Sequence, residues 1–146
     1  ISAANYALQN NVNHTKAMAW IDQAMAQNKT FATKRIKAGL LQQAGKTSES
    51  EKLMQEALAI ATEAELNNYG YQLLAEGTQD KAIEVFLLNT ERNPKSANAW
   101  DSLGEAYAIK GEKDKAIKSF KKSLSLNPPA NVRANSEKFL KQFGAM

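Results

Sequence analysis

The tetrapeptide Asp-Lys-Ala-Ile occupies residues 80–83 and returns at residues 114–117, which is 34 positions later. The same interval separates Phe86 from Phe120 and relates two Asn-Pro dipeptides to each other. A fixed period in the thirties is typical of stacked helical hairpins, because each hairpin presents the same small and aromatic residues to its neighbours. The repeat therefore predicts an all-α solenoid.

The clearest hairpin is predicted over residues 97–130, with a first helix that ends near Gly111 and a second that ends at Asn127. Small and large apolar residues recur on one face of each helix. They are Trp100, Leu103, Gly104 and Tyr107, then Ala116 and Phe120, with Pro128 at the end. This pattern resembles the tetratricopeptide repeat (TPR), with Ser123 in place of the later alanine of the family. The resemblance implies antiparallel helix pairs that coil into a right-handed superhelix.

The repeat pattern continues toward the N-terminus, where fewer positions match it. We expect one TPR-like domain with a partial repeat over about 1–30, repeats over about 31–62, 63–96 and 97–130, and a capping helix over about 131–143. A solenoid needs such a cap because an open end repeat would expose apolar surface. The prediction for residues 1–146 is nine helices and no strands.

Composition agrees with a helical chain, since 146 residues contain only seven Gly and three Pro. No apolar run approaches the roughly 20 residues that cross a bilayer, so we expect a soluble chain, cytoplasmic or periplasmic. The chain opens on Ile1 inside a predicted helix, so we expect a piece of a longer protein, and whether a targeting signal preceded it stays open. The absence of cysteine rules out disulfides and leaves the redox compartment open.

The sequence offers no set of catalytic or metal-binding residues. The chain has no cysteine, and His14 is its one histidine, so the sequence shows no nucleophile paired with a base. We interpret His14 as a residue at the start of a helix. Residues 39–47 resemble a phosphate-binding loop, but five residues separate the two glycines and no strand precedes them. Gly45 is better explained as a turn between helices. We predict a protein without enzymatic activity, cofactor or metal.

The resemblance to the TPR family also implies a concave groove, lined by the first helix of each repeat, that binds a peptide or a partner segment. The family positions that face this groove correspond to Tyr6, Gln9, Arg35, Gln42, Asn67, Asn68, Tyr71, Asn98, Asp101 and Glu105. Amide and phenol groups can pair with a peptide backbone without demanding one sequence. Asp101 and Glu105 are interpreted first as a solvated pair, and otherwise as partners of a basic group on a ligand whose acidic or polar group lies near Arg35.

The favoured function is a scaffold for protein–protein interaction, and two alternatives stay open. One is an RNA-binding helical repeat, based on a pI of about 9.2 and on the lysines gathered over residues 113–122. Because no aromatic residues alternate with these lysines, we interpret them as a solvated helix face and disfavour nucleic acid. The other is the regulatory or interaction arm of a larger protein. Self-association through a groove or an end helix is a further option.

Overall fold

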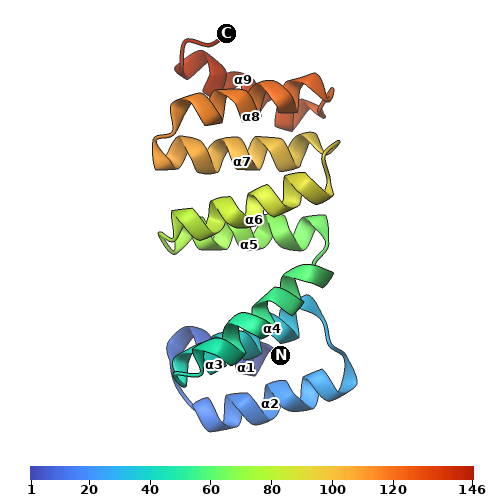
Figure 1. The fold of residues 1–146 in the computed structure, drawn as a ribbon, viewed down its shortest axis with the longest axis vertical. Coiled ribbons are helices and arrows are strands. Elements are labelled where there is room, and N and C mark those ends of the chain that lie inside the picture. Colours follow the sequence, from blue (N-terminus) through green and yellow to red (C-terminus); the bar gives the residue numbers. More distant parts are fainter. The chain divides into compact units, whose positions relative to one another are not determined.

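The computed structural model describes residues 1–146, which form nine α-helices and no strand. This confirms the predicted all-α class and the number of helices. The helices divide into two compact units, residues 1–61 and residues 62–146, which we call unit 1 and unit 2. Unit 1 contains α1 to α4 and unit 2 contains α5 to α9 (Figure 1). None of the nine helices combines the length and the apolar composition that a bilayer span requires.

Unit 1 consists of two hairpins with a small apolar core. Its helices are α1 (Ser2–Asn10), α2 (His14–Gln27), α3 (Phe31–Gln43) and α4 (Thr47–Ile60). Ile21 and Leu40 are fully buried in the core that α1, α2 and α3 share. The start of α2 is fixed to α3, because the imidazole Nε2 of His14 lies 2.8 Å from the carbonyl oxygen of Leu40. Gly45 forms the turn into α4 with a φ of 77°, a backbone conformation that glycine adopts without strain. This agrees with its interpretation as a turn between helices.

Unit 2 is built in two layers. Its helices are α5 (Glu63–Ala75), α6 (Gln79–Arg92), α7 (Ala97–Lys110), α8 (Lys113–Ser125) and α9 (Ala130–Gln142). The first helices of successive hairpins form one layer, in which α5 contacts α7 and α7 contacts α9. The second helices, α6 and α8, each pack against the first helix of their own hairpin and the one that follows.

Glycine determines how closely the two helices of each hairpin approach in unit 2. A Cβ atom on Gly104 would lie 2.7 Å from the ring of Phe120, and one on Gly70 would lie 2.5 Å from the ring of Phe86. Both phenylalanines are fully buried. The 34-residue repeat therefore preserves a matched pair, in which the missing side chain of one helix makes room for the aromatic ring of the other.

Helix α9 closes the end of unit 2 and covers the ring of Phe120. Phe139 stacks on Phe120 with ring centroids 4.8 Å apart and an interplanar angle of 9°. Leu140 is 1% exposed and completes this cluster. The residues 34 positions after Trp100, Leu103, Gly104 and Tyr107 are Ala134, Glu137, Lys138 and Lys141. These four residues form the face of α9 that would contact a further hairpin. Because three of them are charged, this face suits contact with water instead.

Candidate partner-binding face

Six of the ten predicted groove residues lie on the first helices of unit 2. They are Asn67, Asn68 and Tyr71 on α5, and Asn98, Asp101 and Glu105 on α7. Tyr71 is three or four positions from each of the two asparagines on α5, and Asp101 is three or four positions from the other two residues on α7, so each set lies on one side of its helix. We call this surface the first-helix face. Both helices begin at a side-chain cap, because Thr62 accepts from the amide of Glu65 and Ser96 accepts from the amide of Ala99.

The six residues differ in how much water they meet. Asn68 and Asn98 are exposed, whereas Asn67, Tyr71 and Glu105 are half-buried. Asp101 is only 5% exposed. The amides of Asn68 and Asn98 are therefore the polar groups of this face that an incoming protein segment can reach most easily.

Asp101 and Glu105 are held by side chains of α9. The amide nitrogen Nδ2 of Asn135 donates to Asp101 Oδ2 at 2.8 Å and to Glu105 Oε1 at 2.5 Å. The hydroxyl of Ser136 donates to Asp101 Oδ1 at 2.5 Å. The interpretation of this pair as merely solvated is wrong for Asp101, because α9 covers its carboxylate and satisfies both oxygens. A buried carboxylate needs such donors to offset the loss of water.

Tyr71 links the first helices α5 and α7. Its hydroxyl donates to Ser102 Oγ at 3.2 Å, and its ring meets the ring of Phe86 edge-on with centroids 5.2 Å apart. Burial raises the pKa of Tyr71, and the charges of Glu105 and Asp101 raise it further, so the phenol stays protonated and remains a donor at neutral pH. Tyr71 thus stiffens the first-helix face.

Sequence reasoning missed Ser102, Asn135 and Ser136, although the repeat contained a signal for them. Asn135 stands 34 positions after Asp101, and Ser136 stands 34 positions after Ser102. Equivalent residues of neighbouring repeats lie on adjacent first helices, so hydrogen bonds between them follow from the period. Extending the groove positions by one more repeat would have found the donors on α9.

The buried carboxylate of Asp101 gives a testable dependence on pH. Burial raises the pKa of Asp101 above its ordinary value, the hydrogen bonds from Ser136 and Asn135 offset part of this rise, and the charge of Glu105 adds to it. A raised pKa means that the folded state binds the proton more tightly than the unfolded state. The contribution of Asp101 to the free energy of unfolding must therefore increase as the pH falls from the raised pKa to the ordinary value.

We expect wild type to gain stability relative to Asp101→Asn as the pH falls through this window, and the difference to be constant above it. Urea unfolding of both proteins over a series of pH values measures the difference. Other titrating groups cancel in the comparison, because only position 101 changes. A difference that grows as the pH rises would contradict the buried, proton-retaining carboxylate.

The other four predicted groove residues lie in unit 1. Tyr6 and Gln9 lie on α1, where Gln9 is exposed and the aromatic side chain of Tyr6 is 63% exposed. On α3, Arg35 is half-buried and Gln42 is exposed. Helices α1 and α3 contact each other, so these four residues lie on neighbouring helices of one unit.

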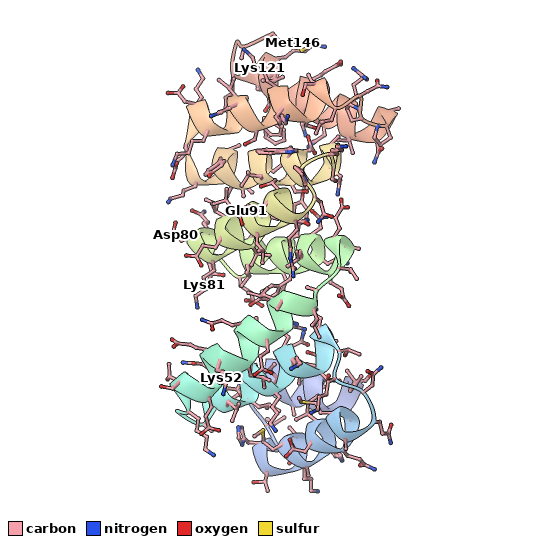
Figure 2. All side chains as sticks on the ribbon, turned by 45° about the vertical axis from the view of Figure 1, so that its right-hand side comes forward. Lys52, Asp80, Lys81, Glu91, Lys121 and Met146 are labelled. Carbon is pink, nitrogen blue, oxygen red and sulfur yellow. The ribbon has the colours of Figure 1, made fainter.

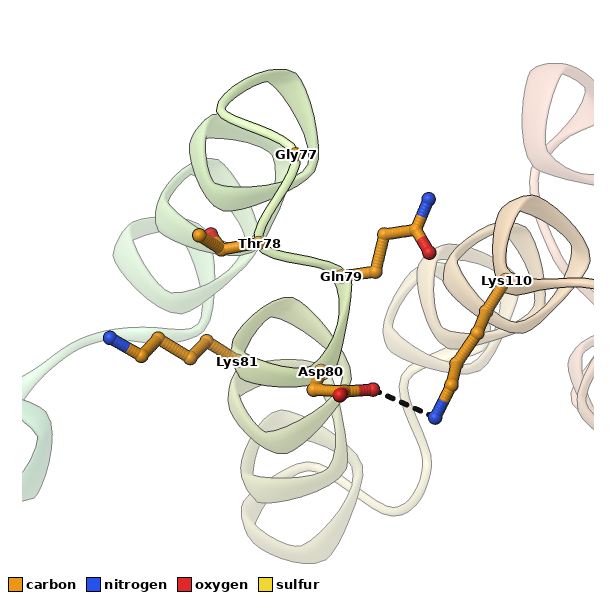
Figure 3. Close-up of a pocket in the computed structure, with 6 residues that line it drawn as sticks. All are labelled: Gly77, Thr78, Gln79, Asp80, Lys81 and Lys110. Atoms are coloured by element: carbon orange, nitrogen blue, oxygen red, sulfur yellow. Dashed lines mark ion pairs between the residues drawn. The ribbon is translucent and has the colours of Figure 1, made fainter.

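An open hollow of about 350 Å³ lies at the turn between α5 and α6, where Gly77, Thr78, Gln79, Asp80, Lys81 and Lys110 line it. Asp80 Oδ1 pairs with Lys110 Nζ at 2.7 Å across it (Figure 3). A similar hollow recurs at residues 111–115, which are the same turn one repeat later. Both are general features of the hairpin turn, and their exposed ion pairs contribute little free energy.

Comparison with known proteins agrees with the repeat seen in unit 2. The model of the tetratricopeptide repeat family matches residues 97–130. Superkiller complex protein 3 of Mus musculus and that of Homo sapiens are each 39% identical to the chain over 59 residues. This match covers 40% of the chain and 4% of the length of those relatives.

Solved structures share the fold at low sequence identity. MamA from Desulfovibrio magneticus aligns with a TM-score of 0.57 at 16% identity, over 99% of this chain and 83% of that one. The Sgt2 TPR domain from Aspergillus fumigatus gives 0.54 at 21% identity, over 78% and 79%. YrrB, described as a TPR protein with an unusual peptide-binding site, gives 0.54 at 20% identity, over 93% and 71%. These likenesses concern the fold alone.

Proposed function

We propose that the chain, which carries a tetratricopeptide repeat over residues 97–130, acts as a non-catalytic scaffold whose first-helix face binds a segment of a partner protein. The observation that carries this proposal is the pair of exposed amides, Asn68 and Asn98, on two adjacent first helices. An amide offers a donor and an acceptor, so it can pair with the backbone of an extended or helical segment. YrrB, which shares the fold, is described as having a peptide-binding site.

The rigidity of this face also supports the proposal. Tyr71 is hydrogen-bonded to Ser102, and α9 holds Asp101 in place, so the face loses little conformational freedom when a segment binds. Ile109 lies one turn after Glu105 on α7 and is 52% exposed. It offers an apolar contact about three turns beyond Asn98 on the same helix, while Glu105 favours a basic side chain on the partner.

In unit 1, we propose Tyr6, Gln9, Arg35 and Gln42 as further contacts for a partner segment. Tyr6 presents an exposed aromatic ring, which can cover apolar side chains of a partner and donate one hydrogen bond. Arg35 adds a positive charge on α3. These residues would prefer an acidic or polar group, in contrast to Glu105 in unit 2.

The proposal is tested by selecting peptides from a displayed random library on the purified chain and measuring their affinity by calorimetry. We expect Asn68→Ala with Asn98→Ala to weaken the selected peptides about tenfold, since each lost hydrogen bond costs about 0.5–1.5 kcal/mol. Both positions are exposed, so the melting temperature should stay unchanged. The matched control is Glu84→Ala on α6, which should bind as wild type does. Peptides that bind the double variant equally well would refute the proposed face.

A further inference from the structure

Three lysines on α8 have no partner within the chain. Lys118, Lys121 and Lys122 are exposed, and no carboxylate lies within ion-pair distance of any of them. Lys121 projects from the end of unit 2 that α8 and α9 form (Figure 2). We call these three residues the α8 lysine face. By contrast, Lys115 Nζ lies 2.5 Å from Glu112 Oε2.

The fold itself does not require lysine at these positions. Helix α6 is the repeat equivalent of α8, and it places Glu84, Leu87 and Leu88 where α8 has its three lysines. The two helices perform the same packing, since Phe86 and Phe120 each fill the space over a glycine of the preceding helix. Helix α6 therefore shows that this fold accepts acidic or apolar residues at the positions where α8 has lysine.

Two lysines of the α8 lysine face repel each other along the helix. Lys118 and Lys122 are four positions apart, and like charges at this spacing destabilise a helix by about 0.2–0.5 kcal/mol. Residues 106–146 contain nine Lys and Arg against three Asp and Glu, so the surroundings do not neutralise the face. A concentration of positive charge that packing does not require supports a role in binding an anionic partner.

We propose that the α8 lysine face binds an acidic segment of a partner protein, that is, a stretch rich in Asp and Glu. Neighbouring lysines on a helix are about 5–6 Å apart at Cβ, while alternate residues of an extended chain are about 6.6 Å apart. Successive carboxylates on one side of an extended acidic segment can thus reach successive ammonium groups.

The same surface fits other polyanions less well. The aromatic ring of α8, Phe120, is fully buried, so this helix offers no exposed ring on which bases of a single-stranded nucleic acid could stack. No exposed apolar residue accompanies the three lysines on this side of α8, where Asp114 and Ser125 are their exposed neighbours. A membrane surface would therefore gain charge contacts without any insertion of apolar side chains.

The test uses a fluorescent polyglutamate peptide as the probe and fluorescence anisotropy at low and at physiological ionic strength. We expect the variant Lys118→Gln/Lys121→Gln/Lys122→Gln to bind the probe at least about tenfold more weakly than wild type. The control removes the same charge from exposed lysines of unit 1, as Lys16→Gln/Lys29→Gln/Lys52→Gln, and should change the affinity less than about twofold. All six positions are exposed, so both variants keep the fold.

Three results would overturn the proposal. If wild type does not bind polyglutamate, the site does not exist. If both triple variants lose the same amount of affinity, net charge alone drives the binding. Tighter binding to single-stranded RNA, or to phosphatidylcholine vesicles containing phosphatidylserine, would assign the face to another class of partner. Affinity for peptides selected on the first-helix face should stay unchanged in the α8 variant, so this proposal and the proposed function fail separately.

Discussion

Replacing Gly104 by leucine is expected to destabilise unit 2 by more than about 2 kcal/mol. The first atom of the new side chain would already lie 2.7 Å from Cε1 and 2.8 Å from Cδ1 of Phe120. Phe120 cannot retreat, because it is fully buried and stacks on Phe139. The helix pair must therefore separate, or α9 must shift to release the ring.

Two effects oppose each other in this substitution, and their magnitudes decide the sign. Leucine improves helix propensity over glycine by about 0.8–1 kcal/mol. Overpacking in a buried contact costs about 1–3 kcal/mol, and the leucine side chain would have to occupy space that the ring of Phe120 already fills. Because the clash begins at the first carbon, we expect the cost of overpacking to dominate. Gly104→Ala should show the same loss in smaller measure.

Urea unfolding followed by circular dichroism measures this loss. Ala75→Leu is the matched control, because Ala75 is exposed near the end of α5 and gains a leucine side chain without a clash. A second background, Phe120→Ala, removes the ring, and Gly104→Leu should cost less there than in wild type. An unchanged melting temperature for Gly104→Leu would contradict the close approach of α7 and α8.

The fold was predictable because its determinants are local and repeated. Gly70, Gly104, Phe86 and Phe120 mark the contact between the two helices of each hairpin, and their common period locates the hairpins without any knowledge of distant contacts.

The state of the individual site residues was less accessible to sequence reasoning. A helical period states on which side of α7 Asp101 lies, but its burial depends on α9, which contributes Asn135 and Ser136 from 34 and 35 residues away. The same reasoning could not separate the exposed Asn98 from the buried Asp101, although both occupy groove positions of the repeat. Exposure is decided by the neighbouring helix, and sequence spacing within one helix does not contain it.

Leu140→Ala is expected to destabilise unit 2 by about 2–4 kcal/mol and to loosen α9. Leu140 is 1% exposed and packs with Ala116 and Phe120, so its truncation leaves a cavity in the contact between α8 and α9. Lys141→Ala is the adjacent control, since Lys141 is exposed and its loss should change the free energy of unfolding by less than about 0.5 kcal/mol. Urea unfolding compares the two variants, and amide hydrogen exchange along α9 shows whether this helix opens before the rest.

The same variant connects the end helix to the candidate binding face. When α9 opens, Asp101 loses the hydrogen bonds from Asn135 and Ser136 and regains water, so the burial that raises its pKa disappears. The dependence on pH that distinguishes wild type from Asp101→Asn should then be much weaker when both proteins also carry Leu140→Ala. If that dependence persisted although α9 exchanged rapidly, a part of unit 2 other than α9 would be responsible for burying Asp101.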